Sequence, residues 1–244
     1  MEGVAGGEQV GVTSMGSVGW TTQFFTYACS LSGRLLCFEP GLGDALPAFG
    51  SQGEIVFVSS EKGTGNLSTW PSAGGLTGLA AADHVCQTLA ANAGYASPSA
   101  FVAWQSTSDS AAFDRLGITG PWRRPGGVRV VATKAGLLSL DRYHNALMSD
   151  IESDDLGVHD AGYVFTGTGT DGQPTGFDCA GWTSASPTDL ATRGTRQSAA
   201  GSWTDALTTS CDQQLQLYCF YGSRKIFVDD FESGGDTAWD AAAP

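Results

Sequence analysis

The chain has 244 residues, of which 41% are hydrophobic and seven are tryptophan, enough to bury a sizeable core in one or two domains. Its formal net charge is -13, so nucleic acid and anionic membrane surfaces are electrostatically repelled and neither is predicted as a partner. No run of eighteen apolar residues occurs, which excludes a membrane-spanning helix and predicts no membrane insertion.

The cysteine pattern favours disulfides. The chain has six cysteines, and no two of them form the C-x-x-C pair that is typical of zinc sites. Disulfides indicate an oxidising compartment, so we predict a secreted, extracellular or cell-surface protein rather than a cytosolic one with free thiols. Residues 1–20 show no basic and then apolar stretch, so no signal peptide is visible. The cysteines are Cys29, Cys37, Cys86, Cys179, Cys211 and Cys219.

The N-terminal segment contains an apparent repeat of a later one. "GWTTQFFTYACSLSGRLLCF" (19–38) parallels "SWTDALTTSCDQQLQLYCF" (202–220), because each has Trp-Thr, then Cys, seven residues and Cys-Phe. Interpreted as a partial repeat, residues 1–44 are the tail of an upstream copy, and Cys29 and Cys37 can pair across a hairpin. The alternative is a chance match in a segment rich in Trp and Thr. Residues 45–53 are predicted to be a linker.

Residues 54–222 are predicted to form one domain. "EIVFVSS" from Glu54 and "LQLYCFY" ending at Tyr221 are typical of strands, and the two can pair. Between them we expect an amphipathic helix ending at Gly94, then a strand at 101–106, a short helix at 110–116 and a strand at 127–134. The apolar positions of the long helix are Ala82, Val85, Cys86, Leu89, Ala90 and Ala93.

The segment from Gly167 to Ser202 shows almost no periodicity and is expected to be a long, ordered, irregular segment with a functional role. It opens with a G-x-G-x-x-G spacing at Gly167, Gly169 and Gly172, which a dinucleotide site also requires. Such a site needs a helix directly after the glycines, whereas Gln173 and Pro174 begin a stretch without helical periodicity. The glycines therefore favour an irregular loop that turns back on itself. Residues 223–244 are predicted to be an acidic, loosely attached C-terminal tail.

Three stretches of the predicted domain resemble the endostatin domain and related bacterial domains, which have the C-type-lectin-like fold. They are "GLTGLAAADHVCQTLAANAGYASPSAFVAWQS", "YVFTGTGTDGQPTGFDCAGWTSASP" and "SWTDALTTSCDQQLQLYCF". The resemblance implies an α+β domain with a mixed, mostly antiparallel sheet, two helices and a long loop region pinned by a disulfide. It also implies the disulfides Cys86–Cys219 and Cys179–Cys211.

The resemblance implies a secreted or cell-surface bacterial binding and adhesion module that recognises a glycan or an extracellular protein through its long-loop face. No nucleophile elbow or H-E-x-x-H motif is present, so we expect no catalysis. A structural subunit that self-assembles into an extracellular array or filament is the alternative. Trp182 is also compatible with a place in the core, whereas an exposed ring would stack on a sugar. The candidate ligand-binding residues are Asp171, Gln173, Thr175, Asp178, Trp182 and Asp205.

Metal binding was considered at two places. Sugar-binding C-type lectins hold calcium through two tripeptides, and Gln173-Pro174-Thr175 and Trp203-Thr204-Asp205 stand in comparable positions but lack the strongest oxygen donors. We therefore predict no cofactor, with calcium as the alternative. His144 and His159 lie among several aspartates, which indicates either a metal site or a solvated acidic loop. His84 is expected to be exposed, because it lies off the apolar stripe of its helix.

Overall fold

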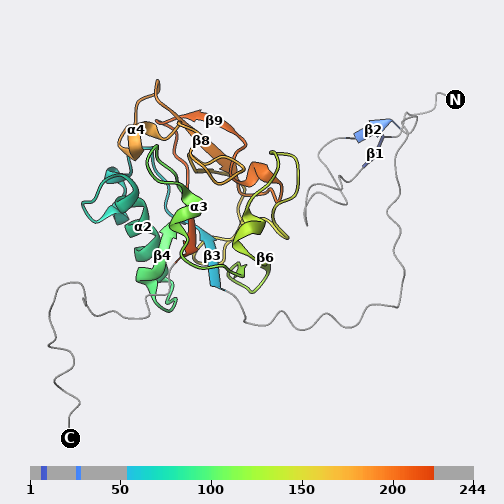
Figure 1. Ribbon diagram of the computed structural model, residues 1–244, viewed down its shortest axis with the longest axis horizontal. Coiled ribbons are helices and arrows are strands. Elements are labelled where there is room, and N and C mark those ends of the chain that lie inside the picture. Colours follow the sequence, from blue (N-terminus) through green and yellow to red (C-terminus); the bar gives the residue numbers. More distant parts are fainter. Residues whose placement is uncertain (1–6, 10–25, 29–53, 223–244) are drawn as a thin grey trace, which may run out of the picture.

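The computed structural model describes residues 7–9, 26–28 and 54–222, which form an α+β structure with few helices and two sheets within residues 54–222 (Figure 1). One sheet has five strands, in the spatial order β4 (Phe101–Ala103), β10 (Tyr218–Tyr221), β3 (Glu54–Val58), β5 (Trp122–Arg123) and β6 (Arg129–Val131). The other has three, in the order β7 (Tyr163–Phe165), β8 (Leu190–Thr195) and β9 (Leu207–Ser210). A separate hairpin pairs β1 (Gly7–Gln9) with β2 (Thr26–Ala28).

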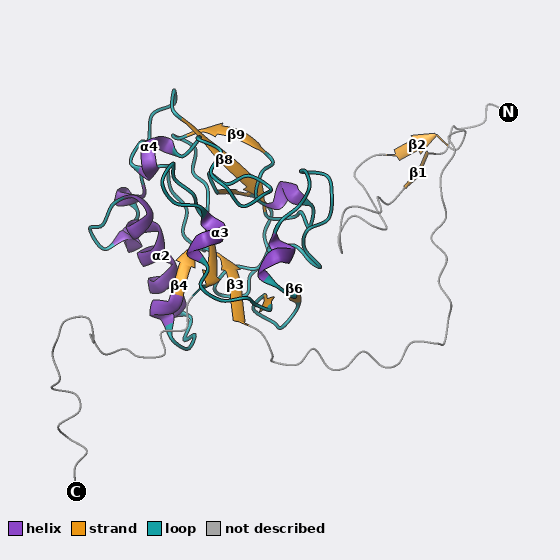
Figure 2. Cartoon of the chain, viewed as in Figure 1, coloured by secondary structure: helices purple, strands orange, loops and turns teal. Residues whose placement is uncertain are grey.

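Helices account for a small part of the described chain, and loops and turns make up much of the rest (Figure 2). The helices are α2 (Gly78–Asn92), α3 (Ala112–Arg115) and α4 (Cys179–Trp182). The 3₁₀ turns are η1 (Leu67–Thr69), η2 (Pro71–Ala73), η3 (Pro98–Ala100), η4 (Lys134–Leu137) and η5 (Gly201–Trp203).

The first and last strands of this region pair with each other, as the sequence predicts. β3 and β10 are antiparallel, with Phe57 opposite Cys219. β10 also pairs antiparallel with β4, and β3 pairs parallel with β5, so the sheet is mixed and mostly antiparallel. Because the pairing joins the two ends of residues 54–222, the fold closes around strands that are far apart in sequence.

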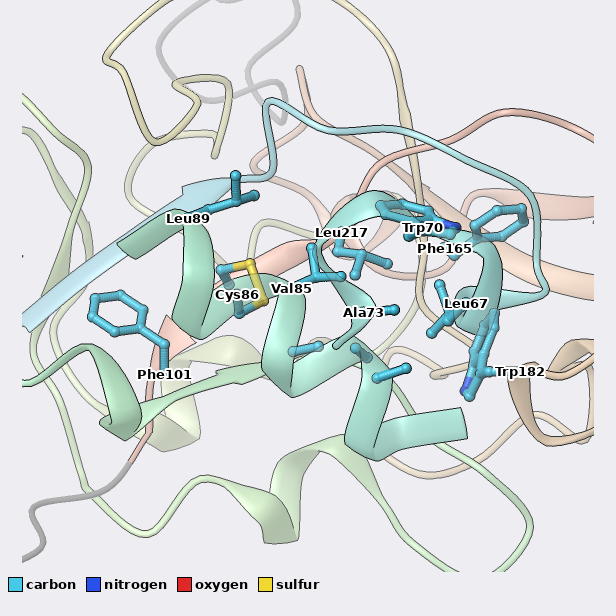
Figure 3. Packing of buried hydrophobic residues seen from close by; sticks show 14 of the residues in the cluster. Leu67, Trp70, Ala73, Val85, Cys86, Leu89, Phe101, Phe165, Trp182 and Leu217 are labelled. Carbon is cyan, nitrogen blue, oxygen red and sulfur yellow. A yellow bond between two sulfur atoms is a disulfide. The ribbon is translucent and has the colours of Figure 1, made fainter. Parts of the chain in front are cut away.

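Helix α2 confirms the predicted amphipathic helix and packs against β4 (Figure 1). Its apolar stripe, including Val85, Cys86 and Leu89, is buried in the core (Figure 3). Gly94 lies just beyond the helix with φ +75° and donates its N–H to the Ala91 carbonyl. A left-handed residue at this point suits glycine, which is why the helix ends there.

Two disulfides join the elements that carry the core. Cys86–Cys219 ties α2 to β10, and Cys179–Cys211 ties α4 to the residue that follows β9. These are the two pairings that the resemblance implies. Disulfides are typical of proteins that fold in oxidising compartments. The predicted pairing of Cys29 with Cys37, the linker and the acidic tail lie outside the described residues.

The core has two hydrophobic clusters. One surrounds α2 and both disulfides and includes Phe165 and Trp182 (Figure 3). The other is rich in aromatic rings, with the centroids of Trp104 and Trp203 5.0 Å apart and Phe220 within 6.1 Å of both. Strands β3 and β10 contribute side chains to both clusters, so the five-stranded sheet separates them.

The structure corrects the expectation of an irregular segment from Gly167 to Ser202. Residues 190–195 form β8, the central strand of the three-stranded sheet. The strand reads "LATRGT", and its small residues Ala191 and Gly194 are both buried. A strand packed closely by its surroundings can use small side chains, so the alternation by which strands are recognised is weak here. The predicted elements at 101–106, 110–116 and 127–134 exist but are shorter than expected.

Candidate functional site

The glycine-rich segment forms a tight turn between β7 and α4. Thr168 bridges to Pro174, the Gly169 N–H donates to the Gln173 carbonyl over 2.8 Å, and no helix follows before Cys179. Gly167 has φ +60°, and a Cβ there would lie 2.8 Å from the Ser106 carbonyl oxygen. The turn therefore matches the predicted loop and lacks the helix that a dinucleotide site requires.

Of the six candidate ligand-binding residues, Trp182 is buried, whereas Thr175 and Asp178 are half-buried and held by contacts within the protein. The Thr175 hydroxyl lies 2.6 Å from the Thr192 hydroxyl, and the Asp178 carboxylate accepts from the Gly181 N–H at the start of α4. Trp182 is 0% exposed, and its Nε1 donates to the Ser106 carbonyl. The prediction of Trp182 as a ligand contact is therefore corrected.

The backbone conformation explains why Trp182 turns inward. Cys179, Ala180, Gly181 and Trp182 all have positive φ, so α4 is a left-handed turn rather than a continuous helix. This turn directs the ring into the core beside Leu67, 5.8 Å from the Phe165 ring (Figure 3). The Cys179–Cys211 disulfide fixes the start of the same turn.

Of the remaining three candidates, Asp171 and Gln173 are exposed and Asp205 is half-buried. Asp171 is exposed and accepts from the Gln173 N–H over 3.0 Å, which keeps the turn closed. Burial raises the pKa of Asp205, the Arg142 guanidinium opposes that rise, and the Asp171 carboxylate adds to it. Asp171 and Asp205 are therefore electrostatic neighbours, although they lie far apart in sequence.

A loop that the sequence analysis did not single out completes this surface. Residues 139–145 lie against the glycine-rich turn, since the Ser139 N–H donates to the Thr170 carbonyl over 2.9 Å. The loop also lies against η5, where the Ser202 N–H donates to the Arg142 carbonyl. Arg142 approaches Asp205 to 3.8 Å and donates to the Ala206 carbonyl over 3.0 Å. We call this loop, together with Asp171, Gln173 and Asp205, the loop face.

The loop face presents two large apolar side chains to water. Leu140 is 90% exposed and Tyr143 is 73% exposed, on a loop whose backbone is hydrogen-bonded to its neighbours. The Ser139 hydroxyl holds the loop closed by donating to the carbonyls of Asp141 and His144. The sequence signal for this site is an apolar and an aromatic residue separated by charged ones in "LDRYH".

Charged groups surround those apolar side chains. His144 Nδ1 lies 2.8 Å from Asp141 Oδ1. The hydrogen bond from His144 and those from the backbone N–H groups of Tyr143 and His144 lower the pKa of Asp141, which keeps its carboxylate ionised at neutral pH. With Arg142 and Asp205, the loop face therefore combines exposed apolar side chains with charged groups, the mixed composition that recognition surfaces have.

The structure separates the residues considered for metal binding. His144 pairs with Asp141, whereas His159 pairs with Glu152 at 3.1 Å. Within residues 54–222 and the short described hairpin, no group of three or more His, Cys, Asp or Glu side chains is arranged to hold a metal ion. In the second tripeptide that was compared with a calcium motif, Thr204 is buried and accepts from Trp104 Nε1 over 2.8 Å.

The expectation of an exposed His84 is also corrected. The ring is half-buried, and its Nδ1 lies 2.8 Å from the Ser72 carbonyl oxygen. The η2 turn folds back over α2, so closely that a Cβ on Gly74 would lie 2.6 Å from the His84 ring. The helical pattern alone does not reveal a turn that covers the polar side of the helix.

Comparisons with known proteins add no assignment: no family model matches the chain, and no curated protein matches it. Across the described ranges, none of the helices is both long and apolar enough to span a bilayer. The geometry of the loop face is therefore the evidence for it as a candidate site.

Proposed function

We propose that this protein is a secreted or cell-surface binding module with a C-type-lectin-like fold, which recognises a glycan or an extracellular protein without catalysing a reaction. The observation that carries the proposal is the exposure of Leu140 and Tyr143 on a loop whose backbone is held in place. Burial of large apolar side chains on binding is favourable, and an ordered loop loses little conformational entropy when it binds.

The arrangement of the elements supports the fold. The terminal strands pair, a long helix is tied to the last strand, and a second disulfide closes the segment between β7 and β9. These features agree with what the resemblance to endostatin-like domains implies. The pairing of cysteines supports a location outside the cytosol.

The test compares the Tyr143→Ala variant with Leu156→Ala, a matched control on another loop whose leucine is 68% exposed. A glycan array and a panel of extracellular proteins are screened with the wild-type chain, with and without a calcium chelator. We expect a ligand whose affinity falls about tenfold or more in Tyr143→Ala, since a central aromatic contact typically contributes more than 1 kcal/mol. The Leu156→Ala variant should bind as the wild type does.

Three outcomes would count against this proposal. Failure to bind any member of either panel would contradict recognition as the function. Equal loss in both variants would contradict the loop face as the site. Loss of binding on chelation would overturn the expectation that no cofactor is needed.

A structural subunit is the second candidate, and one observation favours it: the β1–β2 hairpin repeats the β8–β9 hairpin. Ala28 and Ser210 each directly precede a cysteine. Ala28 pairs with Gly7, the first residue of β1, and Ser210 pairs with Leu190, the first residue of β8. The next two pairs correspond in the same order. The paired residues are Gly7↔Ala28, Glu8↔Tyr27 and Gln9↔Thr26 in one hairpin, and Leu190↔Ser210, Ala191↔Thr209 and Thr192↔Thr208 in the other.

The sequence extends this match beyond the described hairpin residues. Gly194 has a structural reason to be glycine, because a Cβ there would lie 1.9 Å from the Trp203 carbonyl oxygen. Gly11 precedes Trp20 by the same spacing, although both lie outside the described residues. The register and the spacing together support a repeat of like modules, which is the composition expected of an array or filament.

A further inference from the structure

A cation, the guanidinium of Arg193, lies on the three-stranded sheet. Arg193 extends from β8 over the ring of Tyr163 on β7, with its guanidinium carbon 3.8 Å from the ring centroid. Leu207 of β9 is the cross-strand partner of Arg193. Tyr163 is 44% exposed and Leu207 is 56% exposed, so these three side chains form a partly open strip across the sheet, which we call the Arg193 strip.

Arg193 lacks the carboxylate partner that several other arginines of residues 54–222 have. Four of them have a carboxylate oxygen within 4.0 Å, whereas none of the ion pairs among residues 54–222 involves Arg193. Its Nε atom is buried and has no hydrogen-bond partner in the described structure, a feature that it shares with Arg124 and Arg196. The four arginine and carboxylate pairs are Arg115–Asp83, Arg124–Asp150, Arg142–Asp205 and Arg196–Asp160.

The absence of a carboxylate beside Arg193 within residues 54–222 is informative because the chain is rich in acids, with 25 acidic residues against 12 basic ones. Asp205, which directly precedes the residue whose N–H donates to the Arg193 carbonyl, pairs with Arg142 instead. A guanidinium stacked on an aromatic ring is weakly hydrated and keeps its outer N–H donors in a fixed plane, which matches the two oxygens of a carboxylate. The net negative charge does not prevent such contact, since it is screened over about 8 Å at physiological ionic strength.

We propose that the Arg193 strip binds an acidic sugar, with the sugar carboxylate on the outer N–H groups of Arg193 and the apolar face of the sugar ring against Tyr163 and Leu207. This inference rests on the proposed function, binding without catalysis, and adds to the loop face a second site with its own ligand class. The binding is non-covalent and needs no metal ion.

The composition of the strip favours an acidic sugar over an acidic peptide. One unpaired cation matches one carboxylate per ring, as in uronic and sialic acids, whereas an acidic peptide brings several like charges into a chain of net charge -13. A residue with a hydroxyl group also stands beside the strip, because Thr195 is opposite Tyr163 and two residues from Arg193 on the same face of β8. Such a hydroxyl can donate to and accept from those of a sugar.

The experiment measures binding of sialyllactose and a glucuronate oligosaccharide, with lactose and a glucose oligosaccharide as neutral counterparts, by calorimetry. The variants are Arg193→Gln, Arg193→Lys and Tyr163→Ala, and the control is Arg129→Gln, which removes the same charge from an exposed position on β6. We expect at least one acidic sugar to bind. Its affinity should fall about 10- to 100-fold in Arg193→Gln, since a hydrogen bond to a charged group contributes about 1.5–3 kcal/mol.

The remaining variants separate charge from geometry. Arg193→Lys should bind more weakly than the wild type, because lysine keeps the charge but loses the planar fork. Tyr163→Ala should weaken binding of the acidic sugar, and Arg129→Gln should stay within about twofold of the wild type, as expected for a distant exposed charge. Thermal unfolding of each variant shows whether a loss of binding reflects a loss of the fold.

Several results would overturn the inference. No binding of any acidic sugar by the wild-type chain, equal effects of Arg193→Gln and Arg129→Gln, or equal affinity for acidic and neutral sugars would each do so. Preference for an acidic peptide would overturn the ligand class. Binding of a neutral glycan or a protein that depends on Tyr143 and not on Arg193 would sink this inference while leaving the proposed function intact.

Discussion

Asp150 is a buried acid that shares its cation with a second acid. Its Oδ1 accepts from Arg124 Nη1 over 2.8 Å, and the same Nη1 donates to Glu152 Oε1 over 2.9 Å. The other oxygen of Asp150 is buried and has no hydrogen-bond partner in the described structure. Burial first, and the Glu152 carboxylate second, raise the pKa of Asp150 to about 6, against the opposing effects of Arg124 and His159.

This raised pKa predicts how stability depends on pH. Because the folded pKa of about 6 exceeds the unfolded value of 3.8, the folded state binds the Asp150 proton more tightly. The contribution of Asp150 to the free energy of unfolding should therefore fall as pH rises from about 4 to about 6 and level off above that. Urea unfolding of the wild type and Asp150→Asn across this range isolates the effect, and identical pH slopes for the two would contradict it.

Some residue roles can be predicted from the type of side chain, whereas others depend on tertiary contacts. The sequence predicts Asp171 and Asp205 as polar residues of the binding face, and in the structure Asp171 is exposed and Asp205 is half-buried. It cannot show that Trp182 turns inward, because that depends on four successive left-handed residues. It also cannot show that Arg142 meets Asp205, since only the packing of two distant loops brings them together.

At the scale of elements, the periodicity of apolar residues predicted the amphipathic helix α2 but did not predict β8, a strand that lies between two others. Helix α2 was predicted with its stripe and its end, because one side faces the core and the other faces outward. Strand β8 lies between β7 and β9, and small residues occupy its buried positions, so its alternation is faint. The pairing of β3 with β10 could be predicted from the sequence because both strands are rich in aromatic and β-branched residues.

The two disulfides should stabilise these elements to different extents. Cys86–Cys219 closes a loop with a sequence separation of 133, and Cys179–Cys211 closes one of 32. Loop-closure entropy predicts losses of about 5 and about 4 kcal/mol when each pair is replaced by alanines. Urea denaturation of Cys86→Ala/Cys219→Ala and Cys179→Ala/Cys211→Ala measures both. A larger loss from the shorter loop would show that packing around the sulfur atoms outweighs chain entropy.

At the scale of the whole molecule, the acidic composition limits how like copies can associate. Each copy carries a formal charge of -13 at pH 7, so two copies repel each other at low ionic strength. The likeness in register between β1–β2 and β8–β9 is the observation behind the proposed alternative of a structural subunit. The two candidate functions therefore predict different association states when salt screens the charge: a recognition module stays monomeric, whereas a structural subunit associates.

Light scattering across a salt series tests the assembly alternative. If copies associate through their modules, the mass-average molecular weight at pH 7 should rise between about 20 and 500 mM salt, as the Debye length shortens from roughly 20 Å to about 4 Å. Dilution at high salt distinguishes a stable polymer, which persists, from weak association. A chain that remains monomeric at every salt concentration contradicts assembly and leaves recognition as the proposed function, because a single module can still present the loop face.

A polymer that buries Tyr143 would instead identify the loop face as a contact between copies. Such burial is detected as a loss of the reactivity of Tyr143 toward a tyrosine-modifying reagent on assembly.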